Sequence, residues 1–304
     1  MKYLLFLSLV TTAIYCQTAP SNGRSFSNIA TSAAFKAGKR TGTLQGDFVK
    51  ELSGIAPSRR NPGAYWVHND GKKVKEIYLI DSLGKRLATC KLPLTETEDC
   101  EDIEVGIDPK TGISYIYLAD TGDNNKVFAT HYVYRIPEPV LPPGAPQPAE
   151  LNAKELEKWA FQYPEGQQYN AETLLFDPKT QDLFILSKDP GNAILFKFPF
   201  PQSASATTTL TRLGNFPIDK ATGGDVSPNG GEVLIKNKQE IFYWTVGPGE
   251  SLADALQNHD PQRVPYQPET QGEAICFNLG ATGFLTSTER DKSFEQAVFF
   301  YARQ

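Results

Sequence analysis

Five similar hexapeptides decide the fold of this chain: ELSGIA (51–56), DCEDIE (99–104), NAETLL (170–175), ATGGDV (221–226) and QGEAIC (271–276). Counted from the third residue of each copy, they lie 48, 71, 51 and 50 residues apart. A period near 50 residues with several strands in each repeat is typical of β-propeller blades. The repeats therefore predict an all-β protein folded as a five-bladed β-propeller.

Each repeat contains short runs of β-forming residues separated by turn sequences. In the third repeat, TLLFDP, DLFILSKD, AILFKFP and TTTLTRLG follow one another, with the turn DPKTQ (177–181) after the first run. The long interval holds IPEPVLPPGAPQPAE (136–150), which we interpret as an insertion because proline cannot donate to a sheet. Helices are predicted in LNAKELEKW (151–159) and in SLADALQNH (251–259).

The fifth repeat is one strand short, because the chain ends after ICFN, GFLTSTE and AVFFYAR. The segment RTGTLQGDFV (40–49) can supply the missing outer strand and so remove the open sheet edge. We therefore expect a propeller closed by its own N-terminal strand. The alternative is a six-bladed ring whose sixth blade is not recognisable. Residues 40–304 are predicted to form one domain, after a flexible segment at 17–39 that is rich in small residues.

The first residues predict secretion. Lys2 gives a positive start, and the uncharged run LLFLSLVTTAIYC (4–16) follows it. This run is too short to span a bilayer but suits the apolar region of a signal peptide, with cleavage after Cys16. The alternative is a buried N-terminal helix. We expect residues 1–16 to be a signal peptide and the protein to be extracellular, with no membrane insertion.

The amino-acid composition indicates which classes of binding partner the protein can have. Hydrophobic residues make up 40% of the chain and its formal net charge is −5, which argues against nucleic acid and is compatible with cation binding. Cys90 and Cys100 lie close enough in sequence for a disulfide in an oxidising compartment, while Cys276 needs no partner. We expect a monomer.

The third position of the hexapeptides carries a recurring acidic residue. In a propeller, equivalent positions of the innermost strands surround one central channel, so carboxylates there would repel one another unless protonated or neutralised. Ca²⁺ best tolerates an irregular set of oxygen ligands. The sequence predicts a Ca²⁺ site formed by Ser53, Glu101, Glu172, Asp225 and Glu273. The alternative is that the glutamates accept hydrogen bonds from backbone N–H groups of adjacent inner strands.

The loops after the second strands are predicted to open on the same face, where they form a mixed acidic and basic rim. The rim residues are His68, Asp70, Asp120, Asp123, Lys188, Lys236, Glu289 and Arg290. Such a rim suits a polar or phosphate-bearing ligand. Other acidic residues, such as those of TETED (95–99), are interpreted as solvated surface. The chain has no G-x-S-x-G or Walker sequence, so metal-assisted hydrolysis is the catalytic route left open.

Several of these motifs resemble a family of secreted propeller proteins found in bacteria, most of them uncharacterised. The resemblance lies in ELSGIAPSRRNPGAYWVHNDG (51–71), DCEDIEVGIDP, YLADTGDN, NAETLLFDPKT and QGEAI. More distantly, the acidic ring is similar to that of calcium-activated apyrases, which are five-bladed propellers with Ca²⁺ in the channel. Gly54 stands where that family tends to have another acidic residue, and its nucleotide-binding residues have no match here. The resemblance implies calcium binding more than nucleotide hydrolysis.

Three hypotheses about function follow. The first is a secreted calcium-binding propeller that recognises a ligand or an extracellular partner at its channel face, for instance as a component of the extracellular matrix. The second is a Ca²⁺-dependent hydrolase of phosphate esters or nucleotides. The third is a metal-free structural scaffold that interacts through its rim.

Overall fold

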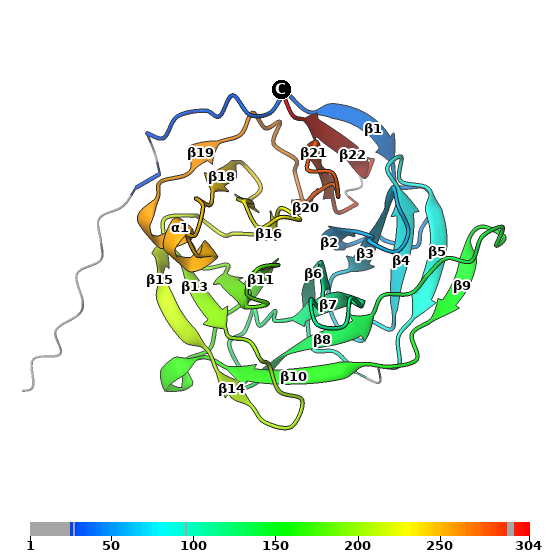
Figure 1. Cartoon of the computed structure of the whole chain (residues 1–304), viewed down its shortest axis with the longest axis horizontal. Coiled ribbons are helices and arrows are strands. Elements are labelled where there is room, and N and C mark those ends of the chain that lie inside the picture. Colours follow the sequence, from blue (N-terminus) through cyan, green and yellow to red (C-terminus); the bar gives the residue numbers. More distant parts are fainter. Residues whose placement is uncertain (1–24, 27, 95, 291–294) are drawn as a thin grey trace, which may run out of the picture.

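The computed structural model describes residues 25–304 apart from 27, 95 and 291–294. Five sheets of four or five strands are arranged around a central axis (Figure 1). This confirms the predicted five-bladed β-propeller, with five blades rather than six. The predicted signal peptide and the first part of the segment that follows it lie outside the described residues. Among the helices of the described part, none has the length and apolarity that crossing a membrane requires.

The blades follow one another along the chain, and each begins with the strand nearest the axis. Blade 1 consists of β2 (Leu52–Pro57), β3 (Ala64–Asn69), β4 (Glu76–Asp81), β5 (Arg86–Lys91) and β9 (Ala149–Asn152). Blade 2 consists of β6 (Cys100–Ile107), β7 (Ser114–Asp120), β8 (His131–Pro137), β10 (Glu157–Gln162) and β14 (Thr208–Thr209). Blade 3 consists of β11 (Ala171–Phe176), β12 (Leu183–Ser187), β13 (Ala193–Phe198) and β15 (Thr211–Phe216).

The last two blades complete the ring. Blade 4 consists of β16 (Gly223–Val226), β17 (Glu232–Lys236), β18 (Ile241–Thr245) and β19 (Gln262–Arg263). Blade 5 consists of β20 (Gly272–Phe277), β21 (Gly283–Thr288), β22 (Ala297–Ala302) and, from the other end of the chain, β1 (Lys39–Thr43). The remaining elements are α1 (Leu252–Asn258) and a short 3₁₀ turn, η1 (Pro164–Gly166).

The core lies between the faces of neighbouring blades. Trp66 of blade 1, for example, packs in one apolar cluster with Ile116 of blade 2. Burying one such side chain fully stabilises the fold by about 1.5–3 kcal/mol. Cys90, Cys100 and Cys276 are buried in these layers as free thiols, so the structure does not contain the disulfide that the sequence allows.

The insertion in the second repeat differs from its predicted structure. The segment predicted as a helix (151–159) forms parts of two strands instead, β9 and β10. In β10 the buried residues Trp159 and Phe161 alternate with less buried neighbours, which is the period of two expected for a strand. Burial of this apolar face outweighed the helix-forming composition of the segment. β9 pairs in parallel with β5, so the insertion covers the outer edge of blade 1. The other predicted helix is confirmed as α1, with Ser251 as its N-cap.

The N-terminal strand closes the ring as predicted. β1 pairs antiparallel with β22, and Lys39 lies opposite Phe300 (Figure 1). The structure differs from the expected flexible segment over residues 28–39, where bridges join Thr31 to blade 4 and Phe35 to the end of blade 5. The ring of Phe35 is buried against the aromatic rings of Tyr243 and Phe284, which explains why this stretch is ordered.

Ring closure can be tested at Gly42. A Cβ on Gly42 would lie 2.0 Å from the backbone oxygen of Leu83, whereas a Cβ on Gly214, in the outer strand of blade 3, would meet nothing within 4 Å. We expect Gly42→Ala to lower the free energy of unfolding by about 1–3 kcal/mol and Gly214→Ala to leave it nearly unchanged. Urea denaturation of both variants measures this. Equal stability of the two variants would contradict the closure described here.

Candidate metal centre at the channel mouth

Irregular pairing of the inner strands presents the acidic side chains. The register of β6 shifts around Glu101, that of β11 around Glu172 and that of β20 around Glu273. Such bulges add one unpaired residue and turn its side chain away from the regular pleat. In β16 the pairing is regular, and the equivalent position is Gly223. The recurring glutamate of the hexapeptides therefore occupies a bulge near the top of the channel.

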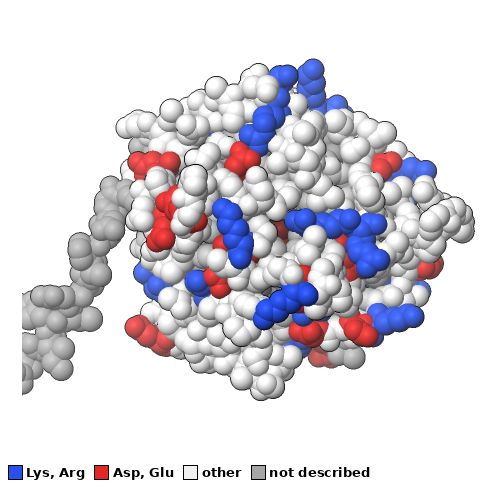
Figure 2. Space-filling view, viewed as in Figure 1, with Lys and Arg blue, Asp and Glu red and all other residues white. Residues whose placement is uncertain are grey.

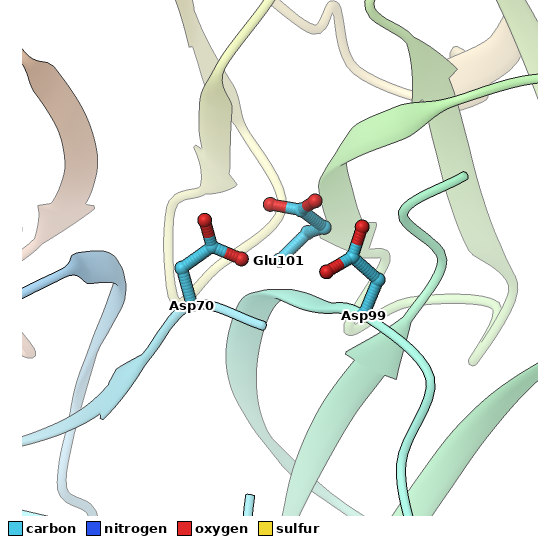
Figure 3. Close-up of side chains that lie close together, drawn as sticks. All are labelled: Asp70, Asp99 and Glu101. Carbon is cyan, nitrogen blue, oxygen red and sulfur yellow. The ribbon is translucent and has the colours of Figure 1, made fainter. Parts of the chain in front are cut away.

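Three carboxylates converge at this end of the channel, which we call the channel mouth. Asp70 follows β3, Asp99 precedes β6 and Glu101 lies in β6, and one oxygen of each lies within 4.8 Å of the other two (Figure 3). We call these three residues the carboxylate cluster. They could hold a metal ion, since the described part of the chain brings no cationic side chain within ion-pair distance of them.

Backbone hydrogen bonds fix the cluster in place. An isolated antiparallel bridge joins Gly71 to Cys100, and its two N–H···O bonds, 3.0 and 3.2 Å long, hold the loop of Asp70 beside the start of β6. The carboxylate of Asp120 accepts hydrogen bonds from the backbone N–H groups of Glu98 and Asp99. The cluster therefore rests on strands of both blades and not on a free loop.

Gly122 makes room for the cluster. Its backbone N–H donates to the carbonyl oxygen of Asp99, so the loop after β7 lies directly against the carboxylates. A Cβ on Gly122 would lie 2.3 Å from Oε1 of Glu101 and 2.6 Å from Oδ2 of Asp99. Only glycine allows this close approach.

The electrostatics of the cluster favour a bound cation. Burial, followed by the charge of Asp99, raises the pKa of Asp70 to about 7. Burial, followed by the charge of Asp120, raises the pKa of Asp99, and burial with the charge of Glu172 raises that of Glu101 well above its ordinary value. The buried Oδ1 of Asp70 has no hydrogen-bond partner among the described residues. These hard oxygen donors could hold a metal ion, which would supply the missing positive charge.

The other two predicted glutamate ligands already have counter-ions. Glu172 forms an ion pair with Lys188, which also lies 3.8 Å from Glu273, and Lys238 lies 3.2 Å from Glu273. Burial raises the pKa of Glu172 to about 7 although Lys188 acts in the opposite direction. Burial tends to lower the pKa of Lys188, but the carboxylates of Glu172 and Glu273 together outweigh it, and the pKa is raised. This half of the mouth is neutralised by ammonium groups.

The last two predicted ligands lie apart from the cluster. Ser53 donates its hydroxyl hydrogen to the carbonyl oxygen of Glu101. Asp225 is buried deeper, where it accepts a 2.6 Å hydrogen bond from the backbone N–H of Phe277 and another from the carboxyl group of Glu104. Of the five predicted ligands, only Glu101 belongs to the carboxylate cluster.

The predicted rim residues also separate into groups. Asp70 belongs to the cluster, and Glu289 lies at the mouth, where it accepts a hydrogen bond from Gln271. Asp123 is buried and accepts hydrogen bonds from backbone N–H groups of its own loop, while Arg290 pairs with Asp47 on the N-terminal segment.

Two further rim residues are completely buried. His68 donates from Nδ1 to the carbonyl oxygen of Asn69, and burial lowers its pKa to about 4, so the ring is neutral. Lys236 lies 4.0 Å from Glu269, and burial lowers its pKa to about 8. Neither side chain is exposed at the rim.

Asp99 was not anticipated, because the acidic stretch 95–99 was interpreted as solvated surface. The available signal was its place at the first position of the DCEDIE hexapeptide, where the first repeat also has an acidic residue, Glu51. On the face shown in Figure 2, basic side chains gather near the ring centre with acidic atoms between them. The molecule thus presents mixed charge around its axis.

Comparisons with known proteins assign the chain to no family. No protein-family model and no curated protein matches it. Among solved structures, a gluconolactonase from Xanthomonas campestris is similar, with 12% identity, a TM-score of 0.44, and coverage of 95% of this chain and 100% of that one. A luciferin-regenerating enzyme is similar at 11% identity and a TM-score of 0.42, covering 90% and 92% of the two chains. The fold and the site define a five-bladed β-propeller whose channel mouth could hold a metal ion.

The buried carboxyl groups of Glu104 and Asp225 should make the stability of the folded protein depend on pH. Burial, followed by the charge of Asp225, raises the pKa of Glu104 well above its ordinary value, so the folded state holds this proton more tightly than the unfolded chain. The stability it contributes is complete below about pH 4.5 and is lost as pH rises. Glutamine can donate the same hydrogen bond without ionising.

We therefore expect Glu104→Gln to gain stability relative to the native protein between about pH 5 and pH 8, by up to about 1.4 kcal/mol per pH unit. Thermal and urea unfolding across this range measure the difference. The exposed Glu155→Gln is the matched control and should follow the native protein. A constant difference between Glu104→Gln and the native protein would show that Glu104 is already ionised in the folded state.

Proposed function

We propose that this protein is a secreted propeller that binds Ca²⁺ through Asp70, Asp99 and Glu101 and recognises an anionic ligand at the same channel mouth. The observation that carries the proposal is the convergence of three partly or fully buried carboxylates, none of which forms an ion pair with a side chain in the described part of the chain. A divalent ion removes the repulsion that raises their pKa values.

The number of protein ligands leaves room for a further molecule. Ca²⁺ takes six to eight oxygen ligands, and three carboxylates fill only part of this shell. The same mouth contains the ammonium groups of Lys188 and Lys238, which are paired with Glu172 and Glu273. An anionic group that completes the coordination of the ion would be held by both the metal and the lysines.

The proposed extracellular location agrees with such a site. The uncharged run at 4–16 supports secretion. Extracellular calcium modules commonly bind the ion with dissociation constants of about 10⁻⁴–10⁻³ M, and an incomplete carboxylate set suits this range.

Calcium titration of the mature protein tests the proposal. At a calcium concentration far above the dissociation constant we expect the melting temperature to rise by roughly 5 °C. Because the pKa of Asp70 is raised to about 7, binding should release protons near neutral pH, and the calorimetric heat should change with the ionisation enthalpy of the buffer. Glu101→Gln removes a ligand, and Gly122→Ala fills the space beside two ligands without changing the charge, so both should abolish binding.

Glu155→Gln is the control for the loss of one carboxylate and should bind calcium normally. The proposal fails if Glu101→Gln binds calcium as the native protein does. It also fails if binding is lost only in Glu172→Gln and Glu273→Gln, since the ion would then lie in the other half of the mouth.

A second candidate is Ca²⁺-dependent hydrolysis of phosphate esters, and Glu289 favours it. Burial, followed by the charge of Glu273, raises the pKa of Glu289 to about 7, so this carboxyl group can exchange a proton near neutral pH at the mouth. We expect Glu289→Gln to abolish any calcium-dependent turnover of phosphoesters while calcium binding persists. Absence of turnover by the native protein with calcium would leave binding as the function.

A further inference from the structure

A polar cavity of about 360 Å³ opens beside the channel mouth between blades 3 and 4. Three lysines line it: Lys188 follows β12, Lys220 lies between β15 and β16, and Lys238 follows β17. We call this cavity the lysine pocket. Asp219 is the one acidic residue among its described lining residues, and its carboxylate accepts a 2.6 Å hydrogen bond from the backbone N–H of Gly191.

The positive charge of the lysine pocket is only partly neutralised. Lys188 and Lys238 are paired with Glu172 and Glu273. The exposed Lys220 forms no ion pair with the described side chains. Three ammonium groups around one cavity form an electrostatic site for an anion.

The remaining polar groups of the pocket serve mainly to shape it. Thr222 donates its hydroxyl hydrogen to the carbonyl oxygen of Gly272. Asn237 accepts hydrogen bonds from the backbone N–H groups of Gln239 and Glu240, and this turn presents Lys238. Among the three ammonium groups, that of Lys220 forms no ion pair with the described side chains, while those of Lys188 and Lys238 are shared with Glu172 and Glu273. Lysine binds phosphate as a point charge, and three lysines suit a group with several charged oxygens better than a neutral polar group.

The lysine pocket adjoins the carboxylate cluster through Lys188. Lys188 forms an ion pair with Glu172 of β11, and β11 lies beside β6, the inner strand that carries Glu101. A ligand in the pocket can therefore extend past Lys188 towards the cluster.

We propose that the lysine pocket binds a phosphate group of a ligand whose second anionic group coordinates the cation held by Asp70, Asp99 and Glu101. The ligand class is a compound with two adjacent anionic groups, of which at least one is a phosphate. The part of this inference that concerns coordination of the cation rests on the proposed function. The part that concerns phosphate binding rests on the three lysines of the pocket.

Pyrophosphate and inorganic phosphate serve as probes, titrated calorimetrically into the mature protein at physiological ionic strength. With calcium present, we expect pyrophosphate to bind more tightly than without it, and more tightly than inorganic phosphate. In Lys220→Ala, pyrophosphate binding should weaken about tenfold or more, because a charge-assisted contact is lost, while calcium binding persists.

Lys72→Ala is the matched control. Lys72 is exposed and its charge acts on Asp99, but it does not line the lysine pocket. If pyrophosphate binding weakens equally in Lys220→Ala and Lys72→Ala, the proposal that the lysine pocket binds phosphate is wrong. The anion would then respond only to the overall positive charge near the channel mouth. Pyrophosphate binding that calcium does not enhance would overturn the two-point arrangement.

The outcomes separate this inference from the proposed function. If calcium does not bind but pyrophosphate still needs Lys220, the calcium site fails, and with it the two-point arrangement, while the phosphate pocket stands. If calcium binds and neither phosphate probe does, the phosphate pocket fails and the calcium site stands.

Discussion

Carboxylates that face one another in a narrow, buried channel are the constraint on which the mouth of this propeller depends. Bulges in three inner strands place a glutamate at the same height in three blades. Removal from water, followed by like charge, raises the pKa values of Glu101 and Glu172. The repulsion between these carboxylates is relieved differently at three places in the channel. Ammonium groups lie beside Glu172 and Glu273, a hydrogen bond joins the carboxyl groups of Glu104 and Asp225, and the carboxylate cluster could hold a metal ion.

The closed ring keeps these groups in place. The inner strands are buried along nearly their whole length, and each contacts the inner strands of both neighbouring blades. Segments from elsewhere in the chain cover the outer edges: β1 on blade 5, β9 on blade 1 and β14 on blade 2. Such coverage removes unpaired strand edges and joins the blades to one another. Loosening any one of these segments would disturb the distances across the channel.

The sequence predicted the fold well because its repeat has a physical cause. Each hexapeptide must form a buried inner strand, so the five copies reveal the blades and the short fifth repeat reveals the closing strand. The helix predicted at 151–159 is wrong, because this stretch forms parts of β9 and β10. The strand-like run KWAFQYP (158–164), with Trp159 and Phe161 packing into the blade interface, corresponds to most of β10.

The site was predicted in part, for a reason that the structure makes clear. Repeat positions show which residues surround the channel, and Glu101, at the third position of its hexapeptide, lies in the carboxylate cluster. The repeat positions do not show which acidic group forms an ion pair with a lysine, because Glu172 lies in β11 whereas Lys188 follows β12. The close approach at Gly122 depends on loop geometry that no spacing reveals.

A crystal structure of the protein grown with saturating Ca²⁺ tests most directly whether the carboxylate cluster binds the ion. We predict an ion about 2.3–2.6 Å from oxygens of the carboxylate cluster, with Lys188 still beside Glu172. An ion bound between Glu172 and Glu273 after the lysines have moved away, or no ion at the mouth, would contradict it.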